Sequence, residues 1–249
     1  MKNANRLPLL ALLLAPLTAC QSSGYMSSVA LTGAESRNQV AESISEGVAF
    51  QRTASQEFET AGRMLLGIQT ASEAEAAAMY SEYLDQIDRC ARQVDRYGEQ
   101  LVTVESGAGE LFAAWEQELE QFSSEAIREQ SSNRLDAARS GFALLFEEMT
   151  SVHGQMVSTL STHKDYALYF NHNLAASSRE LLGAQNDHFV ASMAAMAAEC
   201  GVVESDARTF NERLAGAPAV ETTVEPTPNK AAKKGPANQA KDKNAKGSN

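Results

Sequence analysis

Proline is missing from about 200 consecutive residues in the middle of this chain, which has 249 residues in all. The six prolines lie near the two ends, at Pro8, Pro16, Pro218, Pro226, Pro228 and Pro236. Proline interrupts helix interiors because it lacks the backbone N–H and its ring clashes with the preceding turn. The proline-free segment is also rich in Ala, Glu, Gln, Ser and Leu and poor in Ile and aromatic residues, which disfavours β-strands. These features predict an all-α fold with very long helices.

Apolar residues recur at alternating steps of four and three along four stretches, a heptad pattern typical of packed helices. The stretches run over residues 40–68, 83–115, 138–170 and 182–214. The second keeps its phase through Gly107 and Gly109, so we expect one helix over residues 73–122, loosened at the glycines, rather than two. The first is the weakest, because polar and small residues stand at several of its core positions.

Short breaks separate the four predicted helices, near residues 70–72, 123–124 and 175–178. Ser123 or Ser124 is expected to cap the third helix and Ser177 or Ser178 the fourth, because serine hydroxyls accept hydrogen bonds from the free N–H groups at helix starts. Short connections make neighbouring helices antiparallel. The sequence therefore predicts an elongated antiparallel bundle, or coiled coil, of four long helices.

Helix lengths predict that one end of this bundle projects. The second and third helices should be near fifty residues long, and the first and fourth about thirty-five. At a rise of ~1.5 Å per residue, the longer pair should extend ~20 Å beyond the others as a two-helix hairpin. Its tip falls at residues 122–127, with Phe112 and Trp115 near its base. We expect Trp115, the only tryptophan, to pack between the two helices; an exposed Trp115 would instead be an anchor for a partner.

The first twenty residues have the pattern of a secretory signal. Lys2 and Arg6 precede an apolar run of about eleven residues, whereas a helix needs roughly twenty to cross a bilayer. The run ends in Leu-Thr-Ala and Cys20, which resembles a bacterial lipobox and implies that Cys20 becomes the lipidated first residue. The alternative is a chance cysteine after an ordinary secretion signal. No Asp follows Cys20, which resembles the outer-membrane sorting pattern, so we expect an outer-membrane lipid anchor facing the periplasm.

The chain divides into four parts on these grounds. They are a lipoprotein signal peptide at residues 1–19, a linker at residues 20–33, a helical bundle domain at residues 34–216 and a tail at residues 217–249. Pro, Lys, Ala, Asn and Gly dominate the tail, which has almost no large apolar residue, so we expect it to be disordered. Its lysines could contact anionic peptidoglycan; the alternative is a tail that only aids solubility.

The charge of the chain excludes some partners. The net charge is −11, and the part between the basic leader and the basic tail is more acidic still. Nucleic-acid binding needs clustered Lys and Arg to neutralise phosphates, so an acidic body argues against nucleic acid as a partner. It also argues against broad contact with an anionic lipid surface.

Two stretches of the predicted helices resemble a known family. One, residues 111–123, contains a Trp-Glu pair at Trp115, and the other, residues 170–176, reads Phe-Asn-His-Asn-Leu-Ala-Ala. Together they resemble a family of bacterial envelope proteins known as domain of unknown function 2959, over roughly residues 20–214. The family pattern is closer to Leu-Lys-His-Asn-Leu-Asn-Ala, so its Lys and second Asn are replaced here, and a proline usual upstream is absent. The resemblance implies an all-helical lipoprotein. It identifies no active-site residues, because none is established for the family.

The four histidines offer little support for a metal centre. No Glu-x-x-His motif surrounds any of them, which argues against a ferritin-like site. His163 lies in the third heptad stretch and His188 at a similar height on the fourth helix, so this pair could bind one metal with Asp187 or Asp85. The alternative is that His163 is a hydrogen-bonded core residue. We expect no metal and no cofactor.

His172 has a simpler interpretation at the end of the third helix. With Asn173 it can satisfy the last backbone carbonyls and favour the negative end of the helix dipole. No Ser-His-Asp or Cys-His order with a recognisable motif is present, nor a glycine-rich loop that would cradle phosphate. We therefore expect no enzymatic activity.

Cys90 and Cys200 both stand in the heptad pattern, on the second and fourth helices. One interpretation is two small apolar core residues. The other is a disulfide, because the periplasm is oxidising. Counting residues from the connections between the helices places Cys90 and Cys200 ~7 Å apart along the bundle axis. That is near the Cα–Cα limit of ~7 Å for a bridge, so the offset of the helices decides between the two.

These features favour a structural or protein-interaction module, such as an adaptor or spacer, tethered to the outer membrane through Cys20. Its partner would be another envelope protein or a second copy of the chain. The alternative is a ligand- or metal-binding carrier that uses the interior of the bundle, with His163 and His188 as its candidate ligands.

Overall fold

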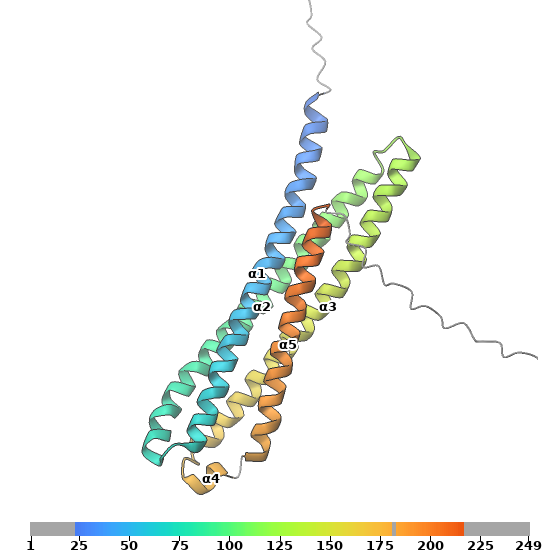
Figure 1. Cartoon of the computed structure of the whole chain (residues 1–249). Helices are drawn as coiled ribbons and strands as arrows, with labels where there is room; N and C mark the ends of the chain where they lie inside the picture. The colour runs from blue at the N-terminus through green and yellow to red at the C-terminus, as the bar shows by residue number, and fades with distance from the viewer. Residues whose placement is uncertain (1–22, 181–182, 217–249) are drawn as a thin grey trace, which may run out of the picture. The chain divides into compact units, whose positions relative to one another are not determined.

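The computed structural model describes residues 23–180 and 183–216, and within these ranges every regular element is an α-helix (Figure 1). The helices are α1 (Ser23–Thr70), α2 (Glu73–Leu119), α3 (Glu125–Phe170), α4 (Ala176–Glu180) and α5 (Gly183–Leu214). Side chains are described for residues 33–179 and 187–216. The prediction of an all-α fold is confirmed for this part of the chain.

Four long helices surround a common core, and each lies beside two others (Figure 1). α1 packs against α2, α2 against α3, α3 against α5, and α5 against α1. Neighbours run antiparallel, because tight turns reverse the chain between the first three helices and α4 lies in the connection before α5. Arg179 of α4 holds this connection to the α1–α2 turn, since its Nη1 donates to the backbone oxygens of Ile68 and Ala71.

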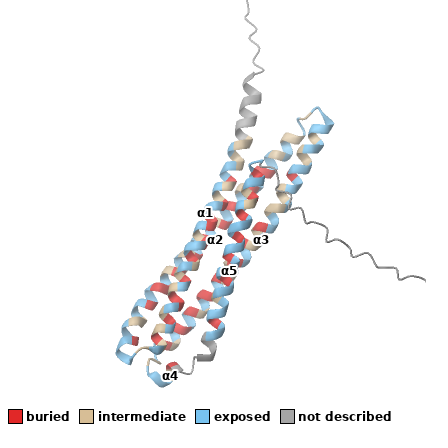
Figure 2. Cartoon of the chain, viewed as in Figure 1, coloured by how far each residue is buried: buried red, intermediate tan, exposed pale blue. Residues whose placement is uncertain are grey.

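The heptad stretches supply the core. All predicted core positions of the first stretch, the weakest in sequence, are buried from Val40 to Ile68. Tyr83, Tyr97 and Phe170 are among the largest fully buried side chains. Figure 2 shows the buried residues along the inward faces of the helices, with exposed residues on the outer faces. Burial of one apolar stripe per helix is the main stabilising contribution of such a bundle.

Gln51 shows how a polar residue is accommodated in that core. Its side chain is 1 % exposed, and its Nε2 donates to the backbone oxygen of Cys200 at 3.1 Å. Its Oε1 accepts from the hydroxyl of Tyr97 at 3.0 Å, so one side chain connects α1 to α5 and to α2. A buried amide with both ends paired avoids the cost of an unsatisfied polar group.

The helix starts differ in part from the serine caps predicted. Ser124 does precede α3, but its side chain makes no capping hydrogen bond. The prediction for Ser177 and Ser178 is wrong, because both lie within α4 and α5 begins at Gly183. The one complete cap among the described starts is at Ser72, whose hydroxyl accepts from the N–H of Glu75 while the Glu75 carboxylate accepts from the N–H of Ser72.

α1 is longer than the sequence indicated. It has 48 residues and begins at Ser23, so the predictions of a helix of about thirty-five residues and of a linker through residue 33 are wrong for residues 23–33. The heptad stretch marks where side chains are buried, whereas a helix can continue on backbone hydrogen bonds alone. The start of the apolar pattern at Val40 therefore did not mark the start of the helix.

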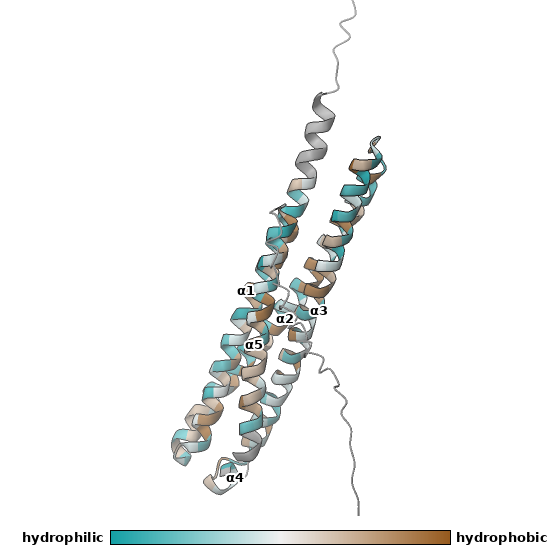
Figure 3. Cartoon of the chain, turned by 45° about the vertical axis from the view of Figure 1, so that its right-hand side comes forward, coloured by the Kyte–Doolittle hydropathy of each residue, from teal (hydrophilic) through white to brown (hydrophobic). Residues whose placement is uncertain are grey.

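The predicted hairpin is present. α2 and α3 continue past the C-terminal end of α5, and Figure 3 shows several turns of hydrophilic residues near their tip (Figures 1 and 3). The last turns of α5 reach Phe142, whose ring centroid lies 6.0 Å from that of Phe210. α2 ends at Leu119, three residues before the predicted end. The N-terminal part of α1 also continues past α5, which the prediction did not include.

Several predictions concern residues outside the described ranges. They include the signal peptide with Cys20 and the tail at residues 217–249. Among the helices that the structure describes, none is both long and apolar enough to cross a membrane.

Candidate functional site

His163 lies in the centre of the bundle with no exposed surface. Its Nδ1 is 2.7 Å from the hydroxyl of Tyr83, which can also donate to the backbone oxygen of His163 at 3.3 Å. Phe58 stacks on the imidazole with a centroid separation of 5.8 Å, and Phe189 meets it edge-on at 4.7 Å. Burial lowers the pKa of His163 to about 4, so the ring is neutral at neutral pH.

The structure does not bring together His163 and His188, the pair that the sequence left open as a possible metal site. His188 is exposed, as are Asp187 and Asp85, whereas the next residue, Phe189, faces the core. Successive residues on a helix differ in direction by about 100°, so a helix that turns Phe189 inward turns His188 outward. The described residues contain no group of three or more His, Cys, Asp or Glu side chains that could hold a metal. The alternative, a hydrogen-bonded core histidine, is confirmed.

One atom of His163 remains unsatisfied. Its Nε2 has no hydrogen-bond partner among the residues that the structure describes. A buried nitrogen without a partner costs about 1–3 kcal/mol. The phenyl rings of Phe58 and Phe189, which contact the imidazole, have no oxygen or nitrogen atom that could accept a hydrogen bond from Nε2.

Cys90 and Cys200 are free and buried, so the disulfide considered from the sequence is not formed. Burial, with the nearby Glu57 carboxylate, raises the pKa of Cys90 to about 12. Burial also raises the pKa of Cys200, which lies beside Gln51 and Ser55. Each thiol thus has its own set of neighbours. Both cysteines are small core residues, which was the alternative to a disulfide.

Asn173, rather than His172, completes the end of α3. The Nδ2 of Asn173 donates to the backbone oxygen of Tyr169 at 2.8 Å. The ring of His172 lies on the surface, with its Nε2 3.2 Å from Nδ2 of Asn171. The capping prediction is therefore confirmed for Asn173 and wrong for the His172 side chain.

The base of the hairpin is held by side chains that bridge α2 and α3. Trp115 is partly buried, and its Nε1 donates to the hydroxyl of Ser131 at 2.9 Å. Arg139 pairs with Glu116 at 2.9 Å, and the rings of Phe112 and Phe142 meet edge-on at 5.8 Å. The prediction that Trp115 packs between the helices is confirmed.

Beyond these bridges the hairpin presents polar side chains, several of them acidic. Glu120, Glu125 and Glu129 are exposed, and Ile127 is an exposed apolar residue with 52 % of its surface accessible. α5 stops at Leu214 and does not accompany α2 and α3 to this end, whereas the N-terminal part of α1 does continue past α5. The tip is therefore the part of the described bundle whose two helices lack α5 as a neighbour.

A groove that the sequence did not reveal runs between α1 and α5. A cavity of about 330 Å³ lies between residues 55–66 of α1 and residues 190–197 of α5. Further cavities of about 180 and 740 Å³ follow the same two helices toward the C-terminal end of α5. The alanine-rich run of α5 was the available signal, because small side chains leave space where larger ones would close the interface.

Comparison with known proteins supports the family resemblance. The model of the family described as "Protein of unknown function (DUF2959)" matches residues 25–213, which is most of the chain. No curated protein matches the chain, and no solved structure does. The match covers both motif stretches and all the long helices, so the chain belongs to the DUF2959 family.

Proposed function

We propose that the chain is an envelope lipoprotein that acts as a protein-interaction module, anchored through Cys20 and contacting a periplasmic protein with the α2–α3 hairpin. The observation that carries the proposal is the extension of this hairpin past the end of α5. Where α5 has ended, the face of the α2–α3 pair that α5 would cover is available to a partner.

The hairpin is suited to this role because its base is braced. Trp115 and Ser131 join the two helices by a hydrogen bond, and the aromatic contact of Phe112 with Phe142 lies nearby. The Glu116–Arg139 ion pair is exposed and adds little stability, about 0–1 kcal/mol. Aromatic packing and the partly buried Trp115 side chain therefore hold the two helices together more than the ion pair does.

The position of the tip supports a partner close to the membrane. A Cβ atom on Gly33 of α1 would lie 3.8 Å from Oε1 of Glu118, so the first turns of α1 and the hairpin are at the same end of the bundle. Cys20 precedes α1 by three residues. A lipid on Cys20 would therefore hold the tip near the membrane surface and direct α4 away from it.

Photo-crosslinking in living cells tests the proposal. A photoreactive residue at Ile127, on the hairpin, is compared with one at Leu168, which is also apolar and exposed but lies at the opposite end of α3. We expect one reproducible envelope protein to be captured from Ile127 and not from Leu168, and capture to be lost in Cys20→Ser. Capture of the chain's own copies alone would indicate a self-assembling spacer, and equal capture at both positions would contradict the proposal.

A further inference from the structure

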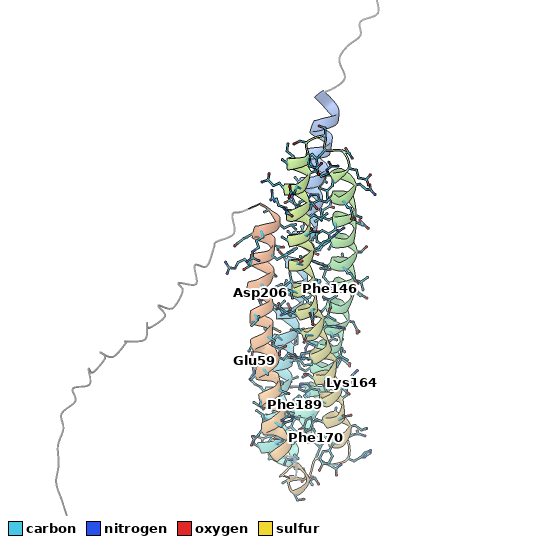
Figure 4. The ribbon with its side chains drawn as sticks, turned by 90° about the vertical axis from the view of Figure 1, so that its right-hand side faces the viewer. Glu59, Phe146, Lys164, Phe170, Phe189 and Asp206 are labelled. Atoms are coloured by element: carbon cyan, nitrogen blue, oxygen red, sulfur yellow. The ribbon has the colours of Figure 1, made fainter. Side chains whose placement is uncertain are left out.

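We propose that the groove between α1 and α5 binds a single acyl chain, in the cavity between residues 55–66 and 190–197. This is a binding site separate from the hairpin, and it does not depend on the interaction role proposed above. Figure 4 shows α5 next to α1 and labels Glu59 of α1, one of the residues that line this cavity.

The lining of the cavity is apolar. Phe58 and Leu66 of α1 face Val190, Met193 and Met196 of α5 across it. Leu66 and Val190 are 40 % and 39 % exposed, so both present apolar surface to the groove and to solvent. A binding site with apolar walls and few polar groups favours an apolar ligand, because each methylene removed from water stabilises the complex.

The cavity is long and narrow. Its lining on α1 extends over residues 55–66, which is about 16 Å along the helix, for a volume of about 330 Å³. This shape favours a slender, flexible ligand such as an extended hydrocarbon chain, whereas a helix with its side chains is about 10 Å across.

Small residues let the side chain of Met193 lie close to α1. A Cβ atom on Gly62 would overlap the ε-methyl group of Met193 and lie 3.0 Å from its sulfur, so Met193 occupies the space beside Gly62. Ala194 and Ala197 line the opposite side on α5. Methionine is unbranched and adapts its shape readily, so Met193 can move along the groove as a chain enters.

The rim offers a polar contact for a head group. Arg63 and Glu59 form an exposed ion pair at 2.7 Å beside the apolar cavity. Nη2 of Arg63 also donates to the hydroxyl of Thr60 at 3.1 Å. A carboxylate or phosphate head group could pair with the Arg63 guanidinium at this rim while the chain fills the cavity.

A fluorescence titration with cis-parinaric acid tests the site on the full chain carrying Cys20→Ser, so that no attached lipid competes. Ala194→Phe and Ala197→Phe fill the cavity. Their matched controls are Ala195→Phe and Ala198→Phe, which replace adjacent exposed alanines of α5 that do not line it. We expect saturable binding that is about tenfold weaker or more in the two filling variants and unchanged in the two controls.

Absence of saturable binding to the unsubstituted groove, or equal weakening in the filling and control variants, would overturn the proposal. Circular dichroism melting shows whether each variant is folded.

If the filling variants unfold, ¹³C-methyl spectra of the methionines give a second measurement. The probe should shift the signals of Met193 and Met196 and leave Met149, which is buried and does not line the cavity, in place. Shifts confined to Met149 would contradict the site.

The acyl chain could belong to a free fatty acid or to a single-chain phospholipid, and competition distinguishes them. Displacement of the probe by dodecanoate alone supports a free fatty acid as ligand. Displacement by both dodecanoate and dodecylphosphocholine supports recognition of the chain whatever its head group. Displacement by neither would overturn the proposal.

Discussion

The hydroxyl of Tyr83 and Nδ1 of His163 lie 2.7 Å apart, and neither residue has any exposed surface. This pair joins α2 to α3 by a hydrogen bond in the middle of an otherwise apolar region. It explains how an imidazole is tolerated in the core, because one of its nitrogens is paired. The other nitrogen, Nε2, is not paired within the described residues, so the site is stabilised only in part.

Replacing Tyr83 by Phe should destabilise the bundle. The change leaves both ring nitrogens of His163 buried without a partner, and an unsatisfied buried group costs about 1–3 kcal/mol. Urea denaturation measures the change in the free energy of unfolding. Tyr80→Phe is the control, because the Tyr80 hydroxyl donates to the backbone oxygen of Ala167 at 2.9 Å from a partly buried position. A smaller loss for Tyr83→Phe than for Tyr80→Phe would contradict the importance of the buried pair.

Acid should destabilise the fold through His163. Burial lowers its pKa from 6.5 to about 4 in the folded state. Between these values the unfolded chain binds the proton and the folded one does not, so stability falls as pH decreases from about 6.5 to about 4. The loss has an upper bound of about 3–4 kcal/mol, because each pKa unit corresponds to about 1.4 kcal/mol.

His163→Gln provides the comparison, since glutamine does not titrate. The difference in the free energy of unfolding between pH 7 and pH 4 should be smaller in this variant than in the parent chain. Carboxyl groups titrate in both proteins and cancel in the comparison. An identical pH dependence would show that His163 is protonated as easily in the folded state as in the unfolded one.

Glu148 should be a destabilising charge at neutral pH. Partial burial raises its pKa, and repulsion from Asp206 of α5 and from Glu147 adds to the shift. Because the folded pKa is raised, the unfolded chain loses this proton first, and stability falls as pH rises through the range between the two pKa values. Glu148→Gln should therefore stabilise the bundle at pH 7, by less than about 1 kcal/mol because the carboxylate is only partly buried.

Thermal unfolding at pH 7 and pH 4 measures this effect. The gain from Glu148→Gln should shrink at pH 4, where the carboxyl is closer to its protonated form. Glu129→Gln, an exposed position on the hairpin, is the control and should change little at either pH. A loss of stability in Glu148→Gln at pH 7 would mean that the carboxylate makes a favourable contact.

The two core thiols should be free and slow to react. Burial raises the pKa of both, to about 12 for Cys90, and only the thiolate attacks disulfide reagents. With Cys20→Ser in place, a thiol titration should find two reactive groups after unfolding without reductant, and far slower reaction in the native protein. Two missing thiols in the unfolded, unreduced chain would show a disulfide between Cys90 and Cys200.

Much of the fold could be predicted because burial is periodic in the sequence. The apolar spacing identified the four long helices, their antiparallel order and nearly all the core residues, including the weak stretch from Val40 to Ile68. The long second and third stretches also predicted the projecting hairpin. Spacing carries this information because a helix in a bundle must turn one stripe of side chains inward at every turn.

Helix ends were predicted less well, since they depend on local hydrogen bonding. α1 begins at Ser23, where no apolar pattern signals it, and α5 begins at Gly183 after the short α4. The pattern of buried residues does not specify where α1 or α5 begins. The complete cap at Ser72 required the reciprocal geometry of Glu75, which a break in the heptad pattern alone does not indicate.

The sequence by itself determined which residues face the core and how many long helices contain them. Only the tertiary structure decided which core residues meet: it pairs His163 with Tyr83, turns His188 to solvent and leaves the thiols of Cys90 and Cys200 unbridged. It also opened the groove between α1 and α5 beside Gly62. The physical reason is that periodicity sets the direction of each side chain from its own helix axis, whereas contacts depend on the spacing, offset and rotation of neighbouring helices.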